Sequence, residues 1–122
     1  MDFHDTGLPP DQTVIKAFNV YMRHYSMSAG HSHVRHQSVE IARILQQHVG
    51  NDPALLSLPL LMILPKEADS VIERTFGREM LAQVQETTRH VETGYAHLAA
   101  AGKPVKLFAM AGAMLTFRDA EK

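Results

Sequence analysis

The stretch Asp52–Ser70, DPALLSLPLLMILPKEADS, decides how the rest of this chain folds. Its middle part, residues 55–64, consists almost entirely of large apolar side chains. A segment that is apolar on every side belongs in the centre of a small protein, where amphipathic neighbours bury all of its faces. We therefore predict a buried central segment with the other elements packed around it.

The ends of this central segment carry helix signals. The Asp52 side chain can cap a helix, and Pro53 is suited to the first helical position, so we predict that a helix begins here. Pro59 removes a backbone donor inside the helix, so a kink or a break is expected there, and Pro65 is expected to end it. The apolar run is about half of the ~20 residues needed to span a bilayer, so we interpret it as core rather than as a membrane span.

On both sides of the stretch, apolar residues recur at steps of three and four, which is typical of one helical face. The predicted N-caps are Asp11 for the first helix and Asp69 or Ser70 for the short helix after the central one, and Gly50 and Gly77 are predicted helix ends. No stretch alternates as a strand would, so we predict an all-α bundle of roughly six or seven helices. The predicted flanking helices cover residues 11–24, 32–48, 71–76, 78–91, 95–101 and 105–117, with a loop at residues 26–30.

A chain of 122 residues is long enough for one core but not for two. We expect a single domain over residues 11–122, after a flexible arm over residues 1–10 that is rich in glycine and proline. The formal net charge of -1 gives no electrostatic reason to expect nucleic acid or a membrane as partner. The chain has no cysteine, and its N-terminus carries acids where a signal peptide would carry bases, so we expect a cytoplasmic protein.

Four short motifs follow one another along the chain: residues 36–45 (HQSVEIARIL), residues 62–70 (MILPKEADS), Phe76-Gly77 and residues 106–109 (KLFA). Their order resembles the HD-domain superfamily, and within it the hydrolase domain of RelA/SpoT proteins. In that family a histidine opens the first motif, a His-Asp pair ends the second helix, and an aspartate ends the last motif. The resemblance implies an HD-type helical bundle and a role in guanosine polyphosphate (ppGpp) signalling.

Most of the residues that would hold a metal ion in such a domain are replaced. The His-Asp pair corresponds to Leu64 and Pro65 and the last aspartate to Ala109, which leaves His36 alone. A metal-bound water becomes a nucleophile at neutral pH only when several imidazole and carboxylate ligands hold the ion. The resemblance therefore implies an inactive hydrolase domain, with no catalytic residue and no cofactor expected.

We expect a remnant of the family's site to persist as a pocket that binds a guanine nucleotide or a protein partner. For three of its members a structural interpretation stands beside this one: His36 as a buried histidine, Asp69 as an N-cap, and Lys66 as a solvated charge. The predicted pocket consists of His36, Leu64, Pro65, Lys66, Glu67, Asp69 and Ala109.

An alternative hypothesis keeps catalysis. His31, His33 and His36 lie close together in the sequence, and with Asp69 they would form a rebuilt Mn or Zn site in a (p)ppGpp or nucleotide phosphohydrolase. The competing interpretation gives His31 and His33 a structural or solvent-exposed role.

A glycine between two alanines suggests a place where a helix is closely approached. Gly112 lies between Ala111 and Ala113 in the last predicted helix. The approaching element would be another helix of the same chain or a second copy of the protein, so a homo-oligomer is a further hypothesis.

Overall fold

The computed structural model describes residues 3–26 and 32–120, and all regular structure within these ranges is helical. The prediction of an all-α bundle of about six helices is confirmed. The described part also contains the short 3-10 helices η1 (Phe3–Thr6), η2 (Lys66–Ala68) and η3 (Leu98–Ala100). Its α-helices are α1 (Gln12–Ser26), α2 (Ser32–Val49), α3 (Pro53–Met62), α4 (Asp69–Phe76), α5 (Arg78–Glu92) and α6 (Lys103–Ala120).

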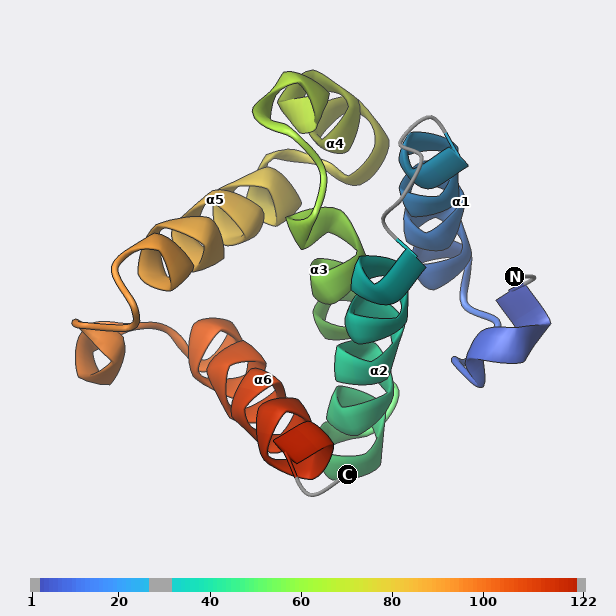
Figure 1. Ribbon diagram of the computed structural model, residues 1–122. Coiled ribbons are helices and arrows are strands. Elements are labelled where there is room, and N and C mark those ends of the chain that lie inside the picture. Colours follow the sequence, from blue (N-terminus) through green and yellow to red (C-terminus); the bar gives the residue numbers. More distant parts are fainter. Residues whose placement is uncertain (1–2, 27–31, 121–122) are drawn as a thin grey trace.

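Helix α3 is the centre of the fold, with α1, α2, α5 and α6 arranged around it (Figure 1). It packs against α1, α2 and α5, while α6 packs against α2 and α5, and α4 packs against α5. Seven of the ten residues of α3 are buried. The apolar run is therefore core, as predicted. None of the helices in the described ranges has the length and apolar character needed to cross a bilayer.

The start of α3 agrees with the sequence prediction, whereas the alternative of a break at Pro59 is wrong. Asp52 is the N-cap, its carboxylate accepts a hydrogen bond from the Leu55 N–H at 3.3 Å, and Pro53 is the first helical residue. The helix continues through Pro59 without a break and ends at Met62, before Pro65. Pro59 is fully buried. Because neighbouring helices cover α3, tertiary packing holds it together across the missing hydrogen bond.

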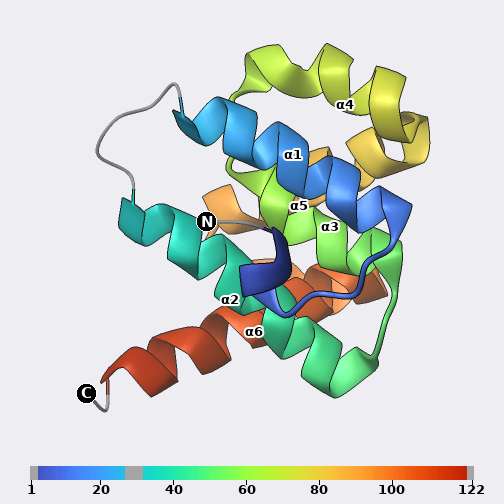
Figure 2. The same ribbon diagram turned by 90° about the vertical axis from the view of Figure 1, so that its right-hand side faces the viewer.

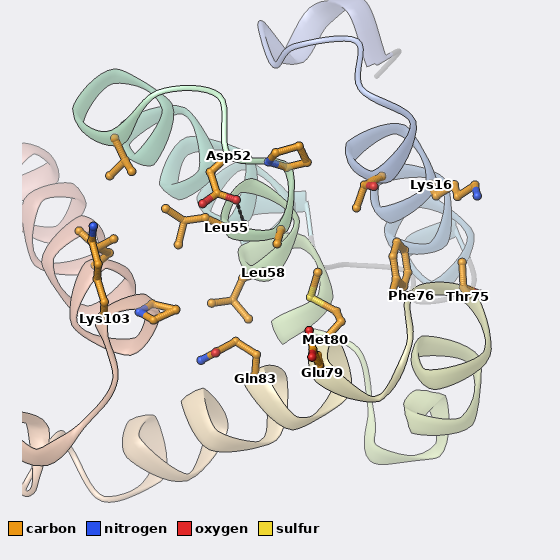
Figure 3. A pocket seen from close by; sticks show the side chains of 16 residues that line it. Lys16, Asp52, Leu55, Leu58, Thr75, Phe76, Glu79, Met80, Gln83 and Lys103 are labelled. Carbon is orange, nitrogen blue, oxygen red and sulfur yellow. Dashed lines mark hydrogen bonds between the residues drawn. The ribbon is translucent and has the colours of Figure 1, made fainter.

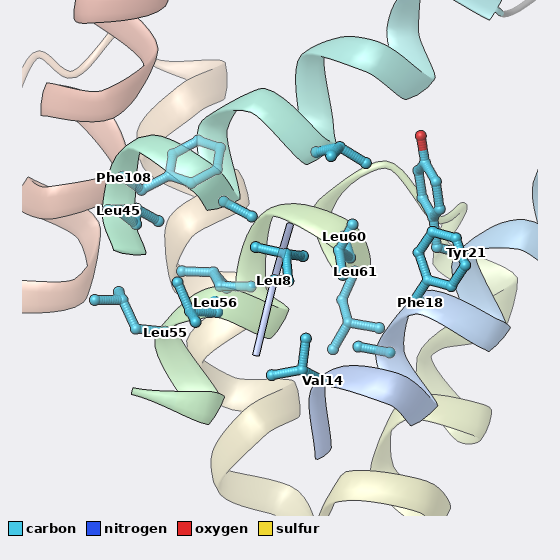
Figure 4. Close-up of a cluster of buried hydrophobic side chains, with 14 of the residues drawn as sticks. Leu8, Val14, Phe18, Tyr21, Leu45, Leu55, Leu56, Leu60, Leu61 and Phe108 are labelled. Carbon is cyan, nitrogen blue, oxygen red and sulfur yellow. The ribbon is translucent and has the colours of Figure 1, made fainter. Parts of the chain in front are cut away.

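One cluster of buried apolar side chains forms the core (Figure 4). The Phe18 and Tyr21 rings of α1 lie 6.2 Å apart between their centroids. Such clusters, not intrinsic helix propensity, supply most of the stability of helices this short. The buried side chains that Figure 4 labels are Leu8, Val14, Phe18, Tyr21, Leu45, Leu55, Leu56, Leu60, Leu61 and Phe108.

The predicted arm is corrected by the structure at residues 3–10. Phe3–Thr6 form η1, and both Thr6 and Leu8 are buried. The Phe3 ring packs edge-on against Phe18 of α1, with 5.6 Å between ring centroids. Figure 2 shows this segment crossing the face of the molecule that α1 and α2 form. It belongs to the domain because Leu8 buries apolar surface in the core.

The predicted helix over residues 95–101 is also wrong, since only η3 forms there. Gly94 and Tyr95 both have positive φ, 63° and 62°, which ends α5 and turns the chain. The segment between Tyr95 and the start of α6 is too short to form a stable α-helix, even though its alanines have a high helix propensity. Partial burial also raises the pKa of the Tyr95 hydroxyl.

Gly112 has no close neighbour inside the described part of the chain. Apart from its chain neighbours and the backbone of α6 itself, no described atom lies within 4 Å of the position that a Cβ would occupy there. The hypothesis of close approach by another helix of the same chain is therefore wrong, and self-association at Gly112 stays a prediction.

The capping role of Asp52 is testable by substitution. Asp52→Ala is expected to lower the free energy of unfolding by about 1 kcal/mol, because the Leu55 N–H loses its acceptor. Asp69→Ala is the matched control, and it should cost less because the hydrogen bond of Asp69 to Gln85 is exposed. Urea denaturation measures both, and equal losses would contradict the assignment.

Gly112→Ala is expected to raise the free energy of unfolding by about 0.5–1 kcal/mol, because alanine restricts the unfolded chain and fits the open position in α6. Denaturation at two protein concentrations, with light scattering, measures the effect. A loss of stability relative to the wild type that is large at high protein concentration and shrinks on dilution would instead place Gly112 in a contact between two copies.

Candidate functional site

The structure places the predicted pocket residues on three elements. Leu64, Pro65, Lys66, Glu67 and Asp69 lie in or next to the turn between α3 and α4, whereas His36 lies in α2 and Ala109 in α6. In the turn, Pro65, Lys66 and Glu67 are exposed, while Leu64 and Asp69 are half-buried. The turn thus presents a charged, solvated surface.

Asp69 is not the N-cap that its position before an apolar stretch predicted. Its backbone is already helical, Ala68 occupies the capping position, and no side chain caps α4. The carboxylate of Asp69 instead accepts a hydrogen bond from the side-chain amide of Gln85 at 3.1 Å. Because η2 leads directly into α4, the helix begins at Asp69 itself, and the side chain of Asp69 joins α4 to α5.

The alternative metal site rests on histidines that the structure describes in part. His31 lies outside the described residues, and the side chains of His33 and His36 in α2 lie outside the described part as well. Within the described part, no group of three or more histidine and acidic side chains is placed to hold a metal ion. Leu64 and Pro65 have hydrocarbon side chains without a lone pair for a metal ion. The alternative site at His31, His33, His36 and Asp69 stays a prediction.

A cavity of about 670 Å³ lies between α1, α3, α5 and α6, next to the end of α4 (Figure 3). Its volume is in the range typical of small-molecule sites. None of the seven predicted pocket residues lines it. Its apolar lining includes Leu55, Leu58, Phe76, Met80 and Leu107.

The charged side chains of this cavity balance one another. Lys16 and Lys103 carry two positive charges, and Asp52 and Glu79 carry two negative ones, so the formal charge of the lining is zero. All four residues are exposed, and Figure 3 shows the Lys16 ammonium directed away from the cavity. The charged groups therefore form a solvated rim around an apolar interior.

Gln83 supplies the polar group inside the cavity. Its amide nitrogen is buried and has no hydrogen-bond partner among residues 3–26 and 32–120. Figure 3 shows the side chain extending from α5 toward α6. A buried donor without an acceptor costs about 1–3 kcal/mol, so an acceptor placed at this amide would stabilise the folded protein.

Sequence reasoning missed Gln83, although a signal was present. Gln83 follows Met80 by three residues and precedes Thr87 by four, which places it on the buried face of α5. A glutamine on a buried helical face needs a hydrogen-bond partner, so its presence there identifies Gln83 as a candidate binding residue.

A second cavity, of about 360 Å³, lies on the surface between α2 and α6. Glu40 of α2 accepts bonds from Arg43 at 3.1 Å and from Arg118 of α6 at 3.2 Å. Exposed ion pairs of this kind contribute about 0–1 kcal/mol each, so this cluster mainly ties the end of α6 to α2.

Comparison of the chain with protein-family models, with curated proteins and with solved structures found no match. The helices define the protein as an all-α domain. The resemblance to HD domains stays a prediction that rests on the residues of the four motifs.

Gln83→Leu is expected to raise the free energy of unfolding by about 1 kcal/mol, because it replaces an unpaired buried donor with an apolar side chain of similar size. Gln85→Leu, two residues along the same helix, is the control and should not stabilise, since Gln85 is exposed and bonded to Asp69. Chemical denaturation compares the two. A destabilised Gln83→Leu variant would show that its amide has a partner in solution.

Proposed function

We propose that this chain is a non-catalytic HD-type domain, related to RelA/SpoT hydrolase domains, that acts by binding a guanine nucleotide or a protein partner in guanosine polyphosphate signalling. The observation that carries the proposal is the pair Leu64 and Pro65 after the end of α3. The family places a His-Asp metal pair there, and two hydrocarbon side chains offer no lone pair to an ion.

The surroundings of this pair support a binding role rather than catalysis. Lys66 and Glu67 follow in η2 with exposed side chains, and a lysine ammonium there is free to approach a phosphate group. Asp69, half of the acidic pair that the family uses on its water, instead accepts a bond from Gln85 that joins α4 to α5. The carboxylate therefore already has a structural function.

The absence of hydrolysis is tested with the purified chain, ppGpp and manganese. We expect no release of pyrophosphate above the protein-free control, because too few ligands converge to activate water. His36→Ala is expected to behave identically. Pyrophosphate release by the wild type that is abolished by His36→Ala would overturn the proposal and favour the phosphohydrolase alternative.

Binding is tested separately by thermal denaturation with ppGpp, GDP and GTP, with ATP as the control for base identity. A ligand that binds the folded chain raises its melting temperature by mass action. Lys66→Ala should reduce the shift, whereas Arg89→Ala, an exposed cation on α5, should not. The absence of a shift with every guanine nucleotide would overturn the nucleotide form of the proposal.

A further inference from the structure

We infer that the cavity between α1, α3, α5 and α6 binds a neutral small molecule with an apolar body and a carbonyl oxygen that accepts a hydrogen bond from Gln83. The site is separate from the turn at Leu64 and Pro65, since neither residue lines the cavity. The inference therefore goes beyond the proposed function and does not rest on it.

The interior of the cavity selects an apolar body. Leu55 and Leu58 of α3 form one side, and Phe76 and Met80 come from the end of α4 and the start of α5. The Phe76 side chain is only half-buried, although an aromatic ring of this size gains most from full burial. An apolar ligand would contact the buried side chains of Leu55, Leu58 and Met80 and would remove the exposed part of the Phe76 ring from water, which favours binding.

The Gln83 amide selects the polar group of the ligand. Its nitrogen carries two hydrogens, it is buried, and it has no acceptor in the described part of the chain. A donor in this condition is satisfied by a lone pair, and a carbonyl oxygen supplies two. Because the nitrogen itself is covered, the Gln83 side chain must turn into the cavity before a ligand oxygen can replace the unmade bond by a made one.

The charges around the cavity favour a neutral ligand over an anion. Asp52 and Glu79 offset the two lysines of the lining, and the Lys16 ammonium is directed away from the cavity, so no excess of positive charge is present to hold an anion. The N-termini of α3 and α6 lie near the cavity and would otherwise attract an anion, but each already has a carboxylate beside it. Asp52 caps α3, and a carboxylate oxygen of Glu86 lies 4.0 Å from the Cβ position of Gly102, next to the start of α6.

Fluorescence titration with Prodan tests the inference. Prodan is a neutral naphthalene ketone whose emission shifts to the blue when it leaves water, and dimethylaminonaphthalene is its counterpart without the carbonyl. We expect saturable binding of Prodan to the full chain. Gln83→Leu should weaken Prodan binding about 2- to 10-fold, the loss that corresponds to one hydrogen bond, and should not weaken binding of the carbonyl-free probe.

Two further variants separate the cavity from the rest of the surface. Gln85→Leu makes the same change on the exposed part of α5 and should bind Prodan as the wild type does. Ala54→Trp adds a large side chain at an exposed lining position and should abolish binding of both probes. Circular dichroism of each variant verifies that the helices are formed.

Three results would overturn the inference. The first is no saturable shift of Prodan emission with the wild type. The second is an equal effect of Gln83→Leu and Gln85→Leu on Prodan. The third is that the anionic probe anilinonaphthalene sulfonate binds the wild type more tightly than Prodan does, and that Gln83→Leu weakens its binding as much as it weakens Prodan binding. This result would assign the cavity to an anion.

Discussion

The burial of α3 on all sides is the constraint on which the rest of this structure depends. A ten-residue helix made almost wholly of leucine, proline and methionine has no face that is stable in water, so several helices must surround it. This need for cover also explains two exceptions to local rules. Pro59 remains inside a continuous helix, and the N-terminal segment is drawn onto the core through Leu8.

The same constraint accounts for the cavity. Pro53 and Ala54 at the start of α3 line the cavity and are half-buried and exposed, so the cover around the first turn of α3 is incomplete. The α5 and α6 helices pack against each other, and Gln83 of α5 contributes a polar side chain with an unpaired buried nitrogen to the lining of the cavity. The unpaired amide of Gln83 lowers the stability of the fold, while the same amide would bind the proposed ligand. Such a trade-off between stability and binding is common at functional sites.

The two proposed sites differ in character because their surroundings differ. The turn between α3 and α4 is exposed and charged, with Lys66 and Glu67 in solvent, which suits a charged ligand or a protein surface. The cavity has an apolar interior and a balanced rim, which suits a neutral molecule. A single chain of this size can hold both, since the turn follows the end of α3 and the cavity is lined by residues near its start.

The sequence by itself determined the helical class, the central position of residues 55–64, the start of α3 at Asp52 and the end of α4 at Gly77, because periodicity and capping are local properties. Only the tertiary structure decided that residues 3–10 join the core, that residues 95–101 form no α-helix and that Asp69 bonds Gln85. The cavity likewise brings together Lys16, Asp52, Gln83 and Lys103 from distant parts of the chain. Such juxtapositions depend on how helices pack, and no local pattern of residues encodes them.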